Sequence, residues 1–194
     1  MPSEKEWVSS LLPRLESAIH GLSMKGVTAA VSQGMRLPYR YEVLTFKDNA
    51  PEMTVPSGYE TDLLIYDMLD QGLWSPRVVI ECKIGSVTTH DAITYSRKAS
   101  THKQVHPYLR YGILIGNWGN HCFPARLFRH GEHFDFMATW AGTEASMSEW
   151  ESFVAVVTDE IRSAREVHSI LSAGRAAKTD HTIVHRPLLF RRTT

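Results

Sequence analysis

The chain has 194 residues, of which 43% are apolar, and this suits one domain with a hydrophobic core. Its 21 basic and 21 acidic residues cancel, which excludes a strongly basic nucleic-acid-binding protein and leaves only a local basic patch for such binding. No run approaches the roughly 18 apolar residues of a membrane span, and the start MPSEKEW does not resemble a secretion signal. We therefore expect a cytoplasmic protein without a membrane partner. The distant Cys82 and Cys122 predict neither a disulfide framework nor a cysteine zinc site.

The first third of the chain predicts a helix, a strand and a loop. Residues 4–21 place apolar side chains at helical spacing behind Ser3, which can cap the helix. The alternating segment RYEVLTF (40–46) is typical of a half-buried strand. The segment 48–58 is rich in Pro, Asn and Gly, and it predicts a loop.

The middle of the chain predicts a β-hairpin followed by a helix. Segments 60–69 and 77–84 are rich in β-forming residues, and the turn-like DQGLWSP joins them. Thr88 precedes Asp91 by three residues, which is a capping-box pattern for a helix that begins at the next residue. Pro107 should end or kink that helix.

The last third predicts two strands and a long helix. The apolar run 111–117 indicates a buried strand, 133–140 a further strand, and 148–171 an amphipathic helix. Residues 133–172 thus form a C-terminal strand and long helix. The order α, β, β, β, α, β, β, α predicts an α/β fold with a central mixed sheet flanked by helices, in a single domain that covers 1–194.

Two charged residues in the second hairpin strand point to chemistry. Glu81 and Lys83 lie two residues apart in a strand, so both side chains leave one face while Cys82 points the other way. An antiparallel strand that starts at Asp62 would add a second carboxylate, and together the two would supply oxygen ligands for Mg²⁺. The metal would orient and acidify a water, and Lys83 would position that water or stabilise developing charge. The simpler alternative is a surface salt bridge between Glu81 and Lys83.

Asp62 in ETDLLIYD, followed by Glu81 and Lys83 in IECK, resembles the active-site pattern of the PD-(D/E)xK nucleases. This family includes type II restriction enzymes, recombination nucleases and junction resolvases. Thr61 stands where the family has its name-giving proline. The resemblance covers about residues 38–117 and implies a restriction-endonuclease-like core with the order α-β-β-β-α-β. It also implies hydrolysis of DNA phosphodiesters by Asp62, Glu81 and Lys83 with Mg²⁺, for which Mn²⁺ can substitute.

The resemblance implies further site residues. Besides Asp62 and Glu81, the backbone carbonyl of Cys82 is an expected metal ligand, and Glu42 on the preceding strand is an additional candidate ligand. Gln104 and Tyr108 have the QxxxY spacing of the RecB-like branch, with Pro107 between them, and are expected to contact DNA.

Basic residues on the predicted helix are candidates for phosphate contacts. Arg97, Lys98 and Lys103 would supply the local positive charge that the whole chain lacks, or would simply form a solvated helix face. DNA is the expected partner, with RNA, single strands and branched DNA left open. Cutting both strands of a duplex favours a homodimer, and a partner protein could supply sequence specificity.

A second group of candidate metal ligands follows in HGEHFDF. His130, Glu132, His133 and Asp135 place four candidate ligands within six residues, without a recognised zinc spacing. A polar hairpin face explains them equally. The leading hypothesis is a DNA endonuclease in restriction, defence or DNA repair. The alternatives are a catalytically silent nuclease-fold module that binds nucleic acid or protein, and a metal-binding protein built on this cluster.

Overall fold

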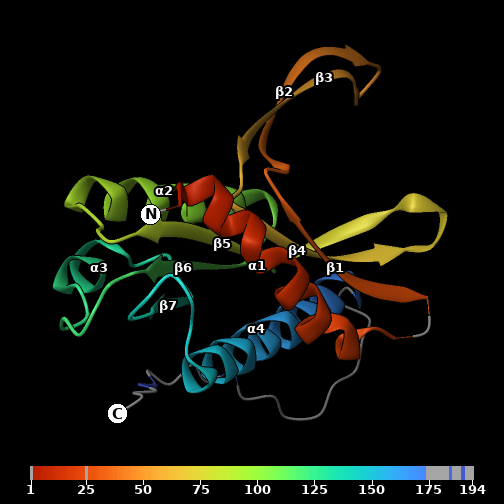
Figure 1. Ribbon diagram of the computed structural model, residues 1–194. Helices are drawn as coiled ribbons and strands as arrows, with labels where there is room; N and C mark the ends of the chain where they lie inside the picture. Colours follow the sequence, from red (N-terminus) through yellow and green to blue (C-terminus); the bar gives the residue numbers. More distant parts are fainter. Residues whose placement is uncertain (1, 25, 174–183, 185–188, 191–194) are drawn as a thin grey trace.

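A five-stranded mixed sheet with helices on both faces forms the centre of the protein (Figure 1). The computed structural model describes residues 2–24, 26–173, 184 and 189–190. Its elements are α1 (Glu4–Ile19), the short 3-10 helix η1 (His20–Leu22), β1 (Val27–Gln33), β2 (Arg36–Lys47), β3 (Ala50–Glu60), β4 (Leu63–Leu69), the 3-10 turn η2 (Asp70–Gly72), β5 (Trp74–Ile84), α2 (Thr89–Val105), β6 (Arg110–Gly116), α3 (Ala125–His130), β7 (Phe136–Thr139) and α4 (Met147–Ala173). The prediction of an α/β fold with a mixed sheet is confirmed.

The strands of the central sheet run in the order β1-β4-β5-β6-β7. β1 and β5 pair antiparallel with β4, and β6 and β7 extend the sheet in parallel to β5. The chain returns from β5 to β6 through α2, because parallel neighbours need a crossover. The hairpin predicted from segments 60–69 and 77–84 is therefore present as β4 and β5.

Each face of the sheet has its own apolar layer. On one face, α1 and α4 pack Trp7, Leu15 and Val157 against β-strand residues such as Ile80. On the other face, α2 and α3 cover strand residues that include Val79 and Ile113. Alternate residues of β5 enter opposite layers, so the strand positions Glu81 and Lys83 on the face that carries α2.

The helix boundaries follow local capping. Ser3 accepts a hydrogen bond from the amide of Glu6 and starts α1, and Thr88 and Asp91 form the predicted capping box that starts α2. α2 ends at Val105, ahead of Pro107. Within the described residues, no helix combines the length and the apolar character needed to cross a membrane.

The loop predicted for 48–58 is wrong, because most of this segment is strand β3. It pairs antiparallel with β2 around a turn in which Asp48 has φ 53°. The prolines that suggested a loop are tolerated because, in the described part of the chain, β3 pairs with β2 alone and its other edge makes no ladder. β2 and β3 form a two-stranded arm that extends away from the body (Figure 1).

Two histidines at the end of α2, the buried His102 and the half-buried His106 that directly follows the helix, hold the base of this arm. His102 Nε2 lies 3.0 Å from the carbonyl oxygen of Leu37, and His106 Nε2 lies 2.9 Å from that of Pro38. Burial lowers the pKa of His102 to about 4, so its ring is neutral and donates from Nε2 to the carbonyl. The body thus holds the arm at its base, where Tyr59 near the end of β3 also packs on His102 with ring centres 5.6 Å apart.

The structure also contains two elements that the sequence did not predict, and it moves the start of two strands: β5 begins at Trp74 rather than at residue 77. Strand β1, with the sequence VTAAVSQ, and helix α3 were not predicted, and β7 begins at Phe136 rather than at residue 133. β1 has few large β-forming side chains, so its pairing with β4 decides its conformation more than its own propensity does. The predicted strand 40–46 belongs to the arm, and β1 is the strand that enters the sheet.

Candidate active site

Asp62 and Glu81 lie side by side at the end of the sheet where β4 begins and β5 ends. Leu63 is paired with Ile80 in the antiparallel β4–β5 ladder, so the residue before Leu63 is level with the residue after Ile80. Asp62 stands in the bend before β4, where its Oδ2 accepts a hydrogen bond of 2.8 Å from the amide of Cys82. Beyond the last backbone pair of the two strands, the Asp62 carboxylate thus accepts the hydrogen bond of a β5 amide in place of a backbone carbonyl.

The backbone carbonyl of Cys82 faces the same side. In an extended strand, the N–H and C=O of one residue point toward the same neighbouring strand. Because the amide of Cys82 points to Asp62, its carbonyl oxygen is directed to that side also. The Cys82 side chain enters the opposite core layer, where burial raises the pKa of its thiol. The structure therefore separates the backbone of Cys82 from its thiol.

Glu81 is a buried carboxyl group with two polar neighbours. Its side chain is 1% exposed. Its Oε1 accepts a hydrogen bond of 2.5 Å from the Tyr111 hydroxyl and lies 3.5 Å from Lys98 Nζ. Burial raises the pKa of Glu81 to about 7, with a further rise from nearby Asp62 that Lys98 opposes. Near neutral pH this carboxyl group is held only partly ionised, which a cation at the site would reverse.

Lys83 does not pair with Glu81. Its Nζ lies 3.2 Å from Oε2 of Glu4 at the start of α1 and 5.5 Å from the ring centre of Tyr95. Burial acts to lower the pKa of Lys83, but its interactions with the Tyr95 hydroxyl and Glu4 outweigh burial and raise the pKa. The ammonium group stays protonated, and the surface salt bridge between Glu81 and Lys83 is not formed.

Lys98 takes the place next to Glu81. It reaches the site from α2, with its Nζ 5.1 Å from the ring centre of Tyr95 and 5.7 Å from that of Tyr59. Asp62 has its pKa raised by burial, against the opposing effects of the Cys82 amide and Lys98. Lys98 was expected on a DNA-binding surface, and it lies instead between the carboxyl groups and the solvent, with 22% of its side chain exposed.

Sequence reasoning missed three residues of the site. Tyr95 lies one helical turn before Lys98, so the two share a face of α2, and this spacing was a usable signal. Tyr111 comes from β6, level with Val79, and no local pattern marked it. Glu4 reaches Lys83 from the first turn of α1, across 79 positions of sequence.

Glu42 does not reach the other carboxyl groups. It lies on β2 in the arm, where 49% of its side chain is exposed and its Oε1 is 2.5 Å from Arg40. Glu42 lies six positions beyond Arg36 at the base of β2, which corresponds to about 20 Å along a strand. The expected role of Glu42 as an additional metal ligand finds no geometric support.

Gln104 and Tyr108 do not form a common surface. α2 ends at Val105, so Tyr108 lies outside the helix. Tyr108 stacks on His168 of α4 with ring centres 4.2 Å apart, while Gln104 is exposed in the last turn of α2. The expected shared face, on which the RecB-like assignment depends, is therefore absent.

The remaining basic candidates of α2 have different surroundings. Lys103 Nζ lies 2.7 Å from Oδ2 of Asp135 and donates to the carbonyl of His133, so it ties α2 to the segment before β7. Arg97 is exposed and lines a small surface cavity with His133 and other residues. Of the three basic residues of α2 that were expected to contact DNA, Arg97 is thus the exposed one.

The 130–135 cluster is divided among separate contacts. Asp135 accepts a hydrogen bond from the amide of Tyr111 and an ion pair of 2.9 Å from Arg110. His133 lies 3.2 Å from Glu132, and His130 ends α3. Among the described residues, no three His, Cys, Asp or Glu side chains are grouped to hold a metal ion. The site of Asp62 and Glu81 is a smaller set, with two carboxyl groups and one carbonyl.

In comparisons with known proteins, no family model and no curated protein matches the chain. The interpretation of the site therefore depends on its geometry and its electrostatics.

Proposed function

We propose that this protein is a metal-dependent nuclease of the PD-(D/E)xK type that hydrolyses DNA phosphodiester bonds. One observation carries the proposal: the Asp62 carboxylate lies level with Glu81 and binds the amide of Cys82, on the strand that also presents Lys83. Two acids and one amine from adjacent chain segments thus gather at one edge of the sheet. Mg²⁺ is the proposed cofactor, and Mn²⁺ is the proposed substitute.

The donor atoms suit a hard cation. The carboxyl oxygens of Asp62 and Glu81 and the backbone carbonyl of Cys82 would hold the metal, and all three are oxygen donors of the kind that Mg²⁺ prefers. Both polar contacts of Glu81 use Oε1, which leaves Oε2 for the cation. A bound metal would orient and acidify a water and neutralise charge on the scissile phosphate. The raised pKa of Glu81 is the expected property of a buried acid that gains from a nearby cation.

The protein's own cations have distinct roles in this proposal. Lys83, with its raised pKa, keeps its proton, so it donates a hydrogen bond to the attacking water or to a phosphate oxygen and does not act as a base. Glu4 and Tyr95 hold the Lys83 amine in place. Lys98 balances the carboxyl groups before substrate binds and lies where a phosphate oxygen can replace Glu81 as its partner.

The order of the elements supports a restriction-endonuclease-like assignment. Without the arm, the chain passes through α1, β1, β4, β5, α2 and β6, which is the α-β-β-β-α-β order of the proposed core. The β2–β3 arm is then an insertion between the first two strands of the core. Restriction, defence and DNA repair are the settings that we propose for such an enzyme.

The proposal is tested by DNA cleavage. Supercoiled plasmid, single-stranded and branched DNA, with an RNA of equal length, are incubated with Mg²⁺, Mn²⁺ or EDTA. Wild-type protein should cut with either metal and not with EDTA, and Lys83→Ala should lose at least about a hundredfold in rate. Arg162→Ala removes a cation that is 65% exposed on α4 and serves as the matched control. Cleavage that continues in EDTA would contradict the metal mechanism.

One observation favours a second function, that of a catalytically silent module for assembly. The arm exposes large apolar side chains, among them Phe46 at 64% and Tyr41 at 51%. Such side chains on a two-stranded arm are suited to contact another protein or a second copy of the chain. In that case none of the substrates is cut, and Lys83→Ala changes neither the oligomeric state nor partner binding.

A further inference from the structure

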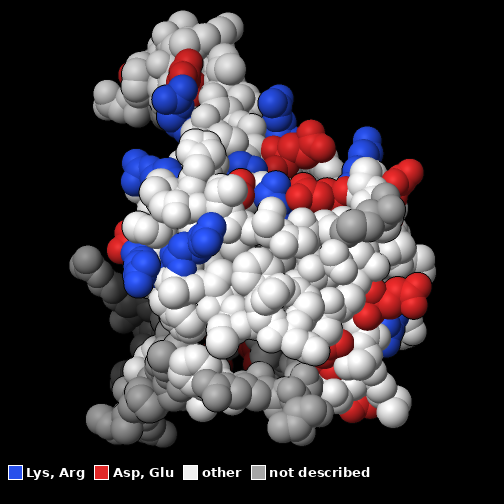
Figure 2. Space-filling model, turned by 60° about the vertical axis from the view of Figure 1, so that its left-hand side comes forward, with Lys and Arg blue, Asp and Glu red and all other residues white. Residues whose placement is uncertain are grey.

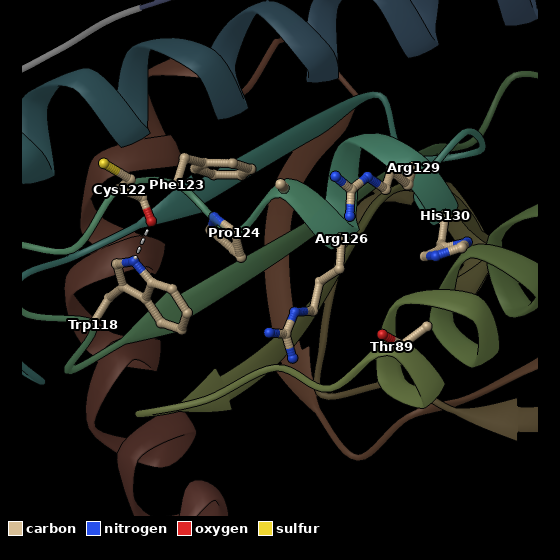
Figure 3. A pocket seen from close by; sticks show the side chains of 9 residues that line it. Thr89, Trp118, Cys122, Phe123, Pro124, Arg126, Arg129 and His130 are labelled. Atoms are coloured by element: carbon tan, nitrogen blue, oxygen red, sulfur yellow. Dashed lines mark hydrogen bonds between the residues drawn. The ribbon is translucent and has the colours of Figure 1, made fainter.

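A cavity of about 430 Å³ opens at the carboxyl ends of the parallel strands β5 and β6 (Figure 3). Thr89, at the start of α2, and Trp118, in the loop after β6, are among the residues that line it. Ligands of α/β proteins commonly bind outside the carboxyl ends of parallel strands. The volume also lies in the range of small-ligand sites. The position and the size of the cavity therefore fit a binding site.

The cavity has one aromatic wall and one basic wall. Trp118 and Phe123 lie on one side of it, Arg129 and His130 lie on the other, and Arg126 extends between them (Figure 3). None of the nine lining residues is an aspartate or a glutamate. A ligand with both a flat ring and a negative charge matches these two walls.

The side chains at the cavity are held to different degrees. Trp118 Nε1 donates a hydrogen bond of 3.1 Å to the carbonyl of Cys122, which fixes the indole ring. Arg126 donates to the carbonyl of Val87 at 2.9 Å. Arg129 is exposed and forms no ion pair within the described part of the chain. The ring is thus preorganised for stacking, and the guanidinium of Arg129 is available for an anion.

We infer that this cavity binds one nucleotide, with the base stacked on Trp118 and the phosphate bound by Arg129 and Arg126. Stacking on an aromatic ring accepts any base, because every base has a π face. Arginine binds phosphate oxygens through two parallel N–H donors. The assignment of this nucleotide to a nucleic-acid substrate rests on the proposed nuclease function.

The position of the cavity links it to the candidate active site. β5 ends at Ile84, directly after Lys83, and the lining residue Thr89 begins α2 five positions later. A second small cavity continues along α2, shares Arg129 and His130 with the first, and adds Arg97. Figure 2 turns this edge of the sheet forward, with basic side chains spread over its left half and acidic ones more numerous on the right. In this inference, a substrate strand with one nucleotide in the cavity runs on toward Lys83 at the end of β5.

The inference is tested by nucleotide binding without catalysis. Titration calorimetry of Lys83→Ala protein in EDTA measures binding of dAMP and dTMP, of inorganic phosphate, and of the nucleoside thymidine. Both nucleotides should bind at least about tenfold more tightly than phosphate or thymidine, because each of these retains only one of the two contacts. Adding Arg129→Ala should weaken nucleotide binding about tenfold, and Trp118→Ala should do the same.

Two further variants keep the test independent of folding and of the nuclease proposal. Trp118→Phe preserves an aromatic face and should retain nucleotide affinity within about threefold, and Arg162→Ala is the control for loss of a surface cation. Equal affinity for phosphate and nucleotide, or no saturable binding at millimolar concentrations, overturns the inference. Because catalysis is not measured, nucleotide binding would stand even if no substrate were cut, and plasmid cleavage would stand even if the cavity bound nothing.

Discussion

The β4–β5 hairpin carries charged clusters at both ends, and the two differ in balance. At the end near its turn, Asp67 is buried between two arginines. Its Oδ2 accepts a hydrogen bond of 2.7 Å from Arg77 and one of 3.0 Å from Arg165, whose Nη2 also donates to Oδ1 at 2.6 Å. Burial acts to raise the pKa of Asp67, but Arg165 and Arg77 outweigh it and lower the pKa. This carboxylate is fully paired, and its role is structural.

At the other end, two carboxyl groups share a weaker set of partners. Among the residues that the structure describes, Lys98 is the one cation in contact with Glu81, at 3.5 Å, and the pKa values of Glu81 and Asp62 are both raised. The hairpin and the residue before it thus carry one acid that is paired with two arginines and two acids that have fewer cationic partners. The two arginines at Asp67 repel a further cation, whereas the carboxyl groups of Asp62 and Glu81 can still bind a cation from solution.

The largest effect should come from Glu81→Gln. This variant keeps the shape of the side chain but removes a charged metal ligand, so cleavage with Mg²⁺ should fall by at least about a hundredfold. The free energy of unfolding should not fall, because a buried ionisable group is replaced by a neutral one. Plasmid cleavage and urea denaturation at pH 8 measure the two quantities. If Glu81→Gln lowered stability and left cleavage intact, Glu81 would have a structural role and would not be a metal ligand.

The next effect should come from Asp67→Ala, at the balanced end. Removing this carboxylate leaves Arg77 and Arg165 near each other with little solvent, and it should cost about 3–5 kcal/mol of stability. Urea denaturation checks the loss, with Arg162→Ala as the control. The cleavage rate of the protein that remains folded should change less than threefold, or about 0.7 kcal/mol. An unchanged unfolding midpoint would contradict the structural role of Asp67.

The two ends should respond to pH with opposite signs. The folded state raises the pKa of Glu81 from 4.5 to about 7, so it binds more protons than the unfolded state between these values. Stability should therefore fall by at most about 3 kcal/mol as pH rises through this window, and stay low above it. Asp67, with its lowered pKa, contributes stability above its ordinary value of 3.8 that is lost as pH falls through its folded pKa.

Magnesium should offset the loss of stability that the ionisation of Glu81 causes. Mg²⁺ binds the ionised carboxyl group, so it should raise the melting temperature more at pH 8 than at pH 5. Scanning calorimetry with and without Mg²⁺ measures the shift in melting temperature at each pH. The Glu81→Gln variant should lose the fall in stability between pH 4.5 and about 7, and Mg²⁺ should shift its melting temperature equally at pH 5 and pH 8. Equal shifts at both pH values would show that Glu81 is not the group that the metal binds.

The smallest effect should come from Glu42→Ala on the arm. Glu42 and Arg40 form an exposed pair, which contributes about 0–1 kcal/mol, so unfolding should change little. Mg²⁺ affinity should also be unchanged, because the arm holds Glu42 away from Asp62 and Glu81. Calorimetric titration with Mg²⁺ tests this, and weakened binding would bring Glu42 back as a ligand.

Local chemistry was enough to predict several elements and failed at others for identifiable reasons. The capping box of Thr88 placed the start of α2, and the two-residue repeat of a strand placed Glu81 and Lys83 on one face. The same reasoning failed for β3, because Pro51 and Pro56 mark a loop unless the strand lies at an edge. The QxxxY spacing failed because α2 ends at Val105, between Gln104 and Tyr108, as the nearby Pro107 indicated.

Local sequence was enough for the starts of α1 and α2, the β4–β5 hairpin and the common face of Glu81 and Lys83, since capping and strand periodicity act over a few neighbouring residues. Only the tertiary structure decided that Lys98 and Tyr111 are the partners of Glu81, at separations of 17 and 30 residues. It also decided that β1, and not the arm, joins β4 in the sheet. Such contacts depend on strand order and on the path of the crossover helix, which no local pattern encodes.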